Sequence, residues 1–523
     1  MTQEVFVDTK DLDLSVIVNA FNPATMAGRA ALETRLSAPL SDRTALMERQ
    51  QQLTAIKEFC TDREKVDRAR SVLKATEEDV ISVGSASEDE RLKEYYTQIL
   101  WDKKSFAARL NHLGWLNEII VFFRTIFVPG LSILLPIMIL LGPLIVFTCV
   151  LQKELTFSEY IRTIQGVIKN AIPSTLGAPR FAGKGGMAET AEQFVHIGLA
   201  IAMLGASIWN QVSAALHMRA IVDDMRKRAE SVQRFSEATR DLSEALGVPV
   251  DLGAPWSFGS LGVFGDAWND PGRIDIVLKA AGHLDMLASL ALKKKVCKPS
   301  LGLDSTGLFL TDVYYPGLKE PRMNSITLDG SGCHCLLTGP NRGGKSTLLK
   351  SIGYAVLMSQ TVGIVFARKA SVPIYNSIIT ALTPADVVGK LSLFEAEIEF
   401  AKTVLGRLDK GRTFLMMDEI FHGTNAHDGV EAAQVFLDRI YQSPELTTIV
   451  STHYMDLPEK YVKRGVQTLC MEASVDPLDS DRLVYTYRLK KGINRFSSVR
   501  EILRERGLLE ARPIPRKNIA RSK

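Results

Sequence analysis

The run from Gly339 to Ser346, G-P-N-R-G-G-K-S, constrains the fold of this chain most strongly. It matches the pattern G-x-x-x-x-G-K-[ST], follows the apolar stretch Cys333–Thr338 and precedes a helical pattern that begins at Thr347. Glycines let backbone N–H groups surround phosphate oxygens, and the start of the following helix adds a favourable dipole. The run therefore predicts a strand, a phosphate-binding loop and a helix, in that order, within an α/β domain.

This loop supplies the predicted nucleotide-binding residues. They are Gly339, Pro340, Asn341, Gly343, Gly344, Lys345, Ser346 and Thr347. Lys345 would bring a positive charge to the β- and γ-phosphates, and the hydroxyl of Ser346 would be a ligand for Mg²⁺. ATP and Mg²⁺ are thus the predicted cofactors.

Two adjacent acids follow a second apolar strand, Thr413–Met417. We expect Asp418 to share the Mg²⁺ ion with Ser346, and Glu419 to polarise the attacking water. Because an acidic pair at the end of a buried strand is the usual companion of a phosphate loop, the two motifs support each other.

A third apolar strand, Thr447–Thr452, leads to His453. At the end of a core strand this histidine is placed to sense the γ-phosphate or to orient water. Lys345, Glu419 and His453 are therefore predicted catalytic residues of an ATPase, which converts ATP and water to ADP and phosphate.

One apolar run raises the question of a membrane. The segment 126–151 is 26 residues long and contains no charged residue. It is longer than the roughly 20 apolar residues that a membrane-spanning helix needs. Pro129, Pro136 and Pro143 recur within it and would favour a kinked or re-entrant segment. A second stretch, residues 195–216, is apolar but contains polar residues. Together they predict a membrane hairpin whose connection, residues 152–194, lies on the far side of the bilayer. The alternative is a buried helical core or an exposed patch that binds a partner.

The remaining segments are mostly helical by pattern. Apolar residues recur at helical spacing near the N-terminus, and Pro39 with Ser41 and Asp42 predicts a turn followed by a helix cap; the spaced residues are Leu32, Leu36, Leu46, Leu53 and Ile56. Residues 217–245 have the pattern of a long charged helix, the Gly- and Pro-rich stretch 247–272 predicts a loop, and a helix is expected from Ile274 to about Lys295.

Net charge, cysteine spacing and the first residues bear on the protein's partners and cellular compartment. A net charge of +4 over 523 residues is too small to predict nucleic-acid binding by itself. The six cysteines have no C-x-x-C spacing, which favours a reducing compartment. The first residues are charged and no apolar segment follows them, so we expect no secretory signal.

Four motifs in order resemble those of the MutS family of mismatch-repair ATPases, a branch of the ABC-type P-loop proteins. Gly339–Thr347 resembles G-P-N-x-G-G-K-S-T, and Asp418–Thr424 resembles D-E-I-x-x-G-T. Leu391–Glu397 resembles the family's S-x-F-x-x-E signature loop, and Ser451–Tyr454 its T-H-Y switch. Weaker likeness extends over residues 1–110 and 217–510.

The resemblance implies a dimer in which Ser392 of one subunit approaches the γ-phosphate that Lys345 of the other subunit holds. The partner would be a second copy or a related ATPase, and DNA would be the substrate that the dimer acts on.

The chain departs from the family at Arg342, where the family has Met, in the loop after the acids at Phe421, His422 and Asn425, and in two larger ways. No mismatch-recognition or connector domain fits before Asp11, and the two apolar stretches stand where the family places its DNA clamp.

We therefore predict an α/β P-loop ATPase domain of the ABC type, preceded by an all-α core/lever domain with an apolar helical insert. The predicted segments are 1–110 (first part of the core/lever), 111–216 (insert), 217–296 (second part of the lever), 297–510 (ATPase) and 511–523 (basic tail). Three functions stay open: a dimeric ATPase in mismatch repair or related DNA metabolism, a membrane-anchored ATPase that acts on a membrane or protein partner, and a structural relative that does not hydrolyse ATP. The ATPase part would lie in the cytosol or nucleoplasm.

Overall fold

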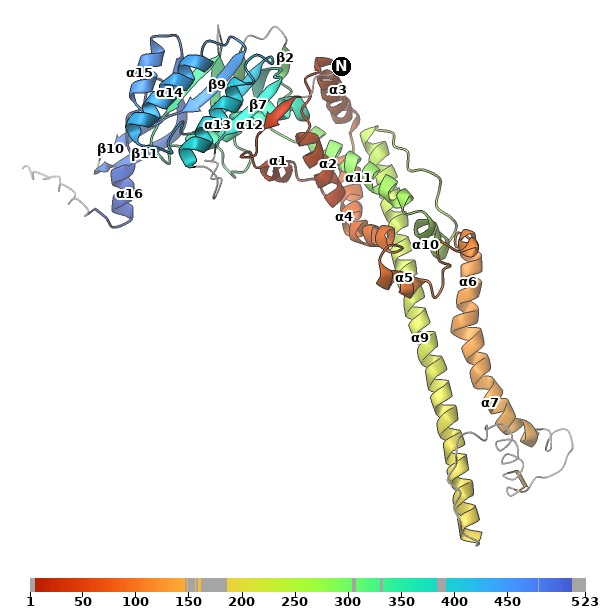
Figure 1. The fold of residues 1–523 in the computed structure, drawn as a ribbon. Coiled ribbons are helices and arrows are strands. Elements are labelled where there is room, and N and C mark those ends of the chain that lie inside the picture. The colour runs from red at the N-terminus through yellow and green to blue at the C-terminus, as the bar shows by residue number, and fades with distance from the viewer. Residues whose placement is uncertain are drawn as a thin grey trace, which may run out of the picture. The chain divides into compact units, whose positions relative to one another are not determined.

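The computed structural model describes residues 5–145, 148, 156, 159–160, 186–302, 307–329, 333–382, 392–477 and 479–509. The chain forms two compact units, drawn in Figure 1. The first consists of Met1–Ser71, Asp241–Val250 and Ala281–Lys523, and the second of Val72–Arg240 and Asp251–Ala280. The basic tail, the end of the first apolar run and most of the connection 152–194 lie outside the described residues.

A seven-stranded sheet of order β1-β7-β8-β9-β5-β10-β11 forms the centre of the first unit (Figure 1). Its strands are β1 (Phe6–Asp8), β5 (His334–Thr338), β7 (Ser377–Ala381), β8 (Thr413–Met417), β9 (Leu446–Ser451), β10 (Gln467–Asp476) and β11 (Asp479–Lys491). Neighbouring strands are parallel except for β10 and β11. Every residue of β5, β8 and β9 is buried, as expected of central parallel strands.

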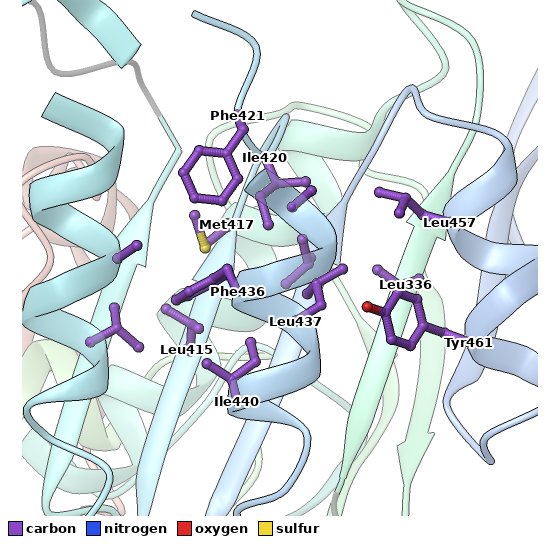
Figure 2. Close-up of a cluster of buried hydrophobic side chains, with 14 of the residues drawn as sticks. Leu336, Leu415, Met417, Ile420, Phe421, Phe436, Leu437, Ile440, Leu457 and Tyr461 are labelled. Atoms are coloured by element: carbon purple, nitrogen blue, oxygen red, sulfur yellow. The ribbon is translucent and has the colours of Figure 1, made fainter. Parts of the chain in front are cut away.

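Helices cover this sheet (Figure 1). They are α12 (Lys345–Thr361), α13 (Leu393–Leu405), α14 (Ala426–Ile440) and α15 (Asp456–Val462). Figure 2 shows Phe436 and Leu437 of α14 packed with Leu415 of β8, and Leu457 and Tyr461 of α15 beside them. A four-stranded sheet of order β2-β6-β3-β4 and the short helix α16 (Val499–Glu505) complete this part. The four strands are β2 (Ser300–Gly302), β3 (Leu308–Val313), β4 (Asn324–Leu328) and β6 (Lys369–Pro373).

The N-terminal helices are α1 (Leu14–Phe21), α2 (Met26–Leu36), α3 (Arg43–Phe59) and α4 (Arg63–Ser85). All five apolar residues predicted for this core are buried, and Asp42 caps α3 by accepting a hydrogen bond from the backbone N–H of Thr44. Asp285, on α11 (Gly272–Ala291), is fully buried and accepts from the backbone and hydroxyl of Thr25 and from Arg70. Its charge is therefore neutralised inside the unit.

The second unit is helical, with α5 (Glu90–Tyr96), η1 (Phe106–Leu110), α9 (Gly186–Leu246) and α10 (Ser260–Asn269). The loop predicted for residues 247–272 is wrong in its second half, because α10 occupies it. Phe264 and Trp268 of α10 are buried and pack around the ring of Tyr96, with centroids 4.8 and 6.2 Å away. Burial of this apolar face outweighs the weak helix preference of its glycines.

An apolar helical arm extends from α6 (Gly114–Phe122) through the π-helical turn η2 (Phe123–Phe127) to α7 (Val128–Ile145). The helix continues through Pro129, and the π turn ends two residues before this proline, which supplies no backbone N–H. In the part of the chain that the structure describes, only Gly114–Leu135 is long and apolar enough to cross a membrane. This segment starts earlier than the predicted 126–151, and the predicted second span, 195–216, lies inside α9 without meeting the same test.

The mixed α/β sheet with flanking helices that we predicted for residues 297–510 is present. One strand of the sheet comes from far outside that range, since β1 pairs with β7 through Phe6 and Ser377. The N-terminal strand thus belongs to the sheet that carries the phosphate loop.

Candidate active site

The phosphate loop joins β5 to α12, as the sequence predicts. Gly339 and Gly344 have positive φ angles of 148° and 91°, conformations that glycine adopts at little cost. A Cβ atom on Gly344 would also lie 3.2 Å from the ring of Tyr487. Gly344 is the N-cap of α12, so the free N–H groups of the first turn of the helix face the loop.

Lys345 is held inside the loop. Its side chain is buried, and Nζ donates a hydrogen bond of 3.1 Å to the carbonyl oxygen of Gly339. Burial lowers the pKa of the ammonium group, while the nearby carboxylates of Asp418 and Glu419 act in the opposite direction. An anion beside Nζ would relieve the desolvation of this charge.

Asp418 and Ser346 meet directly. Ser346 Oγ donates to Asp418 Oδ2 over 2.5 Å, and the other oxygen of Asp418 accepts from the hydroxyl of Ser451. A hydroxyl and a carboxylate are the hard oxygen ligands that Mg²⁺ prefers, so the two predicted metal ligands fit this ion. The sequence analysis named Ser451 only as part of a motif and predicted no role for it. Its contact with Asp418 joins the end of β9 to the residue that follows β8.

Glu419 lies next to His453 in the fold. His453 Nε2 and Glu419 Oε1 share a hydrogen bond of 2.6 Å, and both side chains are partly exposed. This bond is the main reason why the pKa of Glu419 is below its ordinary value, and Lys345 and His422 act in the same direction. Glu419 is therefore ionised at neutral pH, as a proton acceptor must be.

The backbone around Glu419 is strained and firmly held. Glu419 and Phe421 have φ angles of 58° and 50°, a region that costs non-glycine residues about 1–3 kcal/mol each. The N–H of Glu419 donates to Ser451 Oγ over 2.9 Å, and the carbonyl oxygen of Phe421 accepts from the hydroxyl of Tyr454 over 2.7 Å. Such strain persists because the surrounding contacts fix it.

Glu397 of α13 holds the end of the same loop. One carboxylate oxygen accepts from the backbone N–H of His422 over 3.2 Å and lies 3.0 Å from its Nδ1, and the other accepts from Gly423 N over 3.1 Å. His422 Nδ1 is also 2.9 Å from the carbonyl oxygen of Glu419. Sequence reasoning assigned Glu397 to a motif but missed this role, since the two segments are far apart in the chain.

Ser392 is the N-cap of α13 within its own subunit. Its hydroxyl accepts from the backbone N–H of Glu395, and the Glu395 carboxylate accepts in return from the backbone N–H of Ser392 over 2.8 Å, which together form a capping box. Ser392 does not line the cavity at the phosphate loop of its own chain. The predicted contact with a second subunit stays a prediction, and Leu391 lies outside the described residues.

A cavity of about 870 Å³ opens above the loop and is large enough for a nucleotide. Pro340, Asn341, Gly344, Lys345, Ser346, Thr347 and Glu419 line it among the predicted site residues. Its other lining residues include Tyr315, Arg322, Tyr487 and Arg488. Sequence reasoning did not predict Arg322, Tyr487 or Arg488, because their presence depends on β11 and the β3–β4 loop reaching the phosphate loop. Aromatic rings there offer stacking surfaces for a base.

Comparison with known proteins identifies this region. Residues 335–505 match the family model described as MutS domain V. The chain is 31% identical over 232 residues to a protein named Endonuclease MutS2 from Streptococcus pyogenes serotype M49, and equally to one from Streptococcus agalactiae serotype Ia. It is 28% identical over 236 residues to a DNA mismatch repair protein MutS from Persephonella marina.

Each of these matches covers 43% of this chain. The matched region makes up 29% of the length of each MutS2 protein and 26% of the length of the MutS protein. The chain thus spans less than a third of the length of these curated relatives.

Proposed function

The chain belongs to the MutS family through its domain V, and from this premise we propose that it binds ATP with Mg²⁺ and hydrolyses the γ-phosphate. One observation carries the proposal: the carboxyl ends of β5, β8 and β9 bring Lys345, the Ser346–Asp418 pair and the Glu419–His453 pair to one site. A cation, an oxygen ligand set and an ionised base are the parts that phosphoryl transfer to water requires.

Each residue has a role that follows from its contacts. Backbone N–H groups of the loop and the charge of Lys345 would hold the phosphates, and Ser346 with Asp418 would hold Mg²⁺. When bound, Mg²⁺ offsets the negative charge of the phosphates. Glu419, kept ionised by His453, would orient a water molecule and accept its proton.

Two substitutions test this proposal. Lys345→Ala should abolish binding of a fluorescent ATP analogue, since the buried cation beside the phosphates is lost. Glu419→Gln should bind ATP normally and lower single-turnover hydrolysis by about 10²–10⁴-fold, the usual contribution of a general base. Glu431→Gln on the exposed face of α14 is the matched control and should hydrolyse ATP like the wild type. Normal turnover by Glu419→Gln would disprove the assignment of the base.

The active form is proposed to be a dimer, made of two copies or of this chain with a related ATPase. The family resemblance supports it, as does the exposed position of Ser392 at the start of α13, where it can meet another subunit. Ser392→Ala should bind ATP and turn it over slowly. Mixing Ser392→Ala with Lys345→Ala should restore part of the activity if each site uses residues of both subunits, and no restoration at any mixing ratio would count against shared sites.

The proposed substrate of the dimer is DNA, in mismatch repair or related DNA metabolism. Support comes from the relatives, whose names are Endonuclease MutS2 and DNA mismatch repair protein MutS. The buried cysteines Cys60, Cys333, Cys335 and Cys470 form no disulfide, which agrees with a cytosolic or nucleoplasmic place for the ATPase part. DNA binding that weakens steeply with salt would support this function, and its absence in the purified full chain would refute it.

The apolar arm α6–η2–α7 favours a second candidate, a membrane-anchored ATPase. An 18-residue stretch within Gly114–Leu135 has a mean hydropathy of 1.9, and only 11% of that stretch is buried, whereas a core helix of a soluble protein would be mostly buried. The described residues from Thr125 to Ile145 carry no charge, and a helix of this length spans roughly 30 Å, the thickness of the hydrocarbon layer.

Carbonate extraction of membranes that contain the full chain tests this candidate. The wild type should stay in the membrane pellet, and Leu134→Arg with Leu135→Arg should release it, since each arginine adds roughly 3 kcal/mol at the centre of a membrane helix. Val435→Arg with Val462→Arg, on exposed positions of α14 and α15, is the matched control and should change nothing. Release of the wild type itself would refute membrane anchoring and leave the ATPase proposal intact.

A further inference from the structure

A second cavity lies beside the nucleotide cavity in the first unit. Its volume is about 770 Å³, and it is formed by the residues that follow α11 and by the loop between β3 and β4. Its basic residues are Lys293, Lys294, Lys295, Lys319 and Arg322. None of the phosphate-loop residues Gly339–Thr347 lines it.

The charge of this cavity is unbalanced. Its five basic residues face a single acid, Glu320, so its formal charge is +4, as large as the net charge of the entire chain. Across the described residues, Lys294, Lys295, Lys319 and Arg322 form no ion pair with a carboxylate. Like charges gathered in one concavity repel each other, and an anion bound among them removes that repulsion.

The position of these charges is built into the fold. Lys295 has a left-handed backbone with φ 60°, and its carbonyl oxygen accepts a hydrogen bond of 2.8 Å from the hydroxyl of Tyr314. The ammonium of Lys293 donates to the carbonyl oxygen of Ala20, and burial lowers its pKa. A strained backbone and a partly buried lysine at the same place distinguish this cavity from a run of freely solvated lysines.

The two cavities share one wall. Leu318, Glu320, Pro321 and Arg322 line both, so the β3–β4 loop contacts the nucleotide site on one side and the basic cavity on the other. A ligand that orders this loop from the basic side would alter the nucleotide site, and by linkage a bound nucleotide would alter the affinity of that ligand.

We propose that the basic cavity binds phosphate groups of a second anionic ligand next to the nucleotide, and that DNA backbone phosphates are their source. The choice of DNA rests on the proposed function. Lysine ammonium groups contact phosphates as point charges, so this site would hold DNA without reading its sequence. Free polyphosphate has the same chemistry and is the alternative source.

A charge-removal variant tests the site. Lys294→Gln, Lys295→Gln and Lys319→Gln together remove three charges and leave Lys293 and the shared residue Arg322 in place. The matched control removes three exposed lysines of the same unit that lie outside both cavities: Lys57→Gln, Lys410→Gln and Lys463→Gln. Both variants should keep the melting temperature and ATP affinity of the wild type, which verifies that they fold.

Binding of a fluorescent DNA duplex is then measured by anisotropy between about 50 and 200 mM salt. The slope of log K against log salt should fall by about 2–3 in the cavity variant, at roughly 0.9 per lost phosphate contact, and low-salt affinity should fall at least about tenfold. The control variant should match the wild type. Equal DNA binding by the cavity variant and the control overturns the proposal, while the proposed DNA function stands.

Inorganic triphosphate distinguishes the two sources. The measurement uses Lys345→Ala as background, so that the nucleotide site does not contribute. If the chain binds triphosphate only when the three cavity lysines are present, yet binds no duplex, the anion site stands and DNA is overturned as its source. If neither probe binds, the whole inference is overturned, and ATP turnover by the wild type still decides the proposed ATPase function separately.

Discussion

Removing the carboxylate of Glu397 should slow hydrolysis without weakening nucleotide binding. This side chain is only 14% exposed and accepts two backbone hydrogen bonds, from His422 and Gly423. Hydrogen bonds to a charged group contribute about 1.5–3 kcal/mol each. The left-handed backbone of Glu419 and Phe421 costs about 1–3 kcal/mol per residue. The free energy of the hydrogen bonds to Glu397 is thus similar to the strain energy of the backbone at Glu419 and Phe421. The loop that contains Glu419 and Phe421 should therefore relax once the Glu397 carboxylate is removed.

The size of the effect follows from these numbers. If Glu397→Ala removes about 3 kcal/mol of the energy that holds the loop, Glu419 occupies its working position about a hundredfold less often. Single-turnover hydrolysis should fall by about that factor. Binding of a fluorescent ATP analogue should change less than about threefold, because Lys345, Ser346 and Asp418 do not contact Glu397.

Two further variants make the result specific. Glu399→Ala, on the same helix, removes an exposed carboxylate that contacts only Lys402 and should hydrolyse ATP normally. Glu397→Gln keeps one acceptor oxygen and should recover part of the rate. If Glu397→Ala turned over ATP within about twofold of Glu399→Ala, the reasoning about the strained loop would be refuted. A parallel loss of binding and of melting temperature would instead assign Glu397 a purely structural role.

Three other predictions concern the site and the core. Because His453 lowers the pKa of Glu419, wild-type turnover should persist as pH falls until the lowered pKa is reached; in His453→Ala the pKa rises, and the acid limb of the pH–rate profile should move to higher pH. An unchanged limb contradicts this. Ser451→Ala should raise the Mg²⁺ concentration for half-maximal activity by about tenfold, since Asp418 loses a donor, while Ser474→Ala on β10 should have no effect. Trp268→Ala should destabilise the second unit by about 3–5 kcal/mol, measured by denaturant unfolding, whereas Phe258→Ala, whose side chain is 98% exposed, should be neutral.

Contiguous residues made much of the candidate site's arrangement predictable. A phosphate loop works through glycines, a lysine and a hydroxyl at fixed spacing in one short segment of the chain, so its chemistry can be predicted from the sequence alone. The acids after β8 and the histidine after β9 follow the same logic, since the carboxyl ends of parallel strands meet at one edge. Helix caps are equally local, and Asp42 is an example.

Contacts between distant segments were not predictable in this way. Nothing near Ser451 indicates that its hydroxyl would reach Asp418, and nothing near Glu397 indicates that it would hold His422, because strand order and helix docking create both contacts. Likewise, α10 lies in a Gly-rich stretch and forms because its apolar face is buried.

The same distinction applies to charge. In the sequence, Lys293–Lys295 only mark the end of the helix predicted from Ile274 to about Lys295. The fold places them opposite Lys319 and Arg322, which belong to a different loop. Spacing along a chain determines which chemical groups are present, but burial and strand pairing determine which of them meet, because the free energy of packing depends on the whole unit rather than on neighbours in sequence.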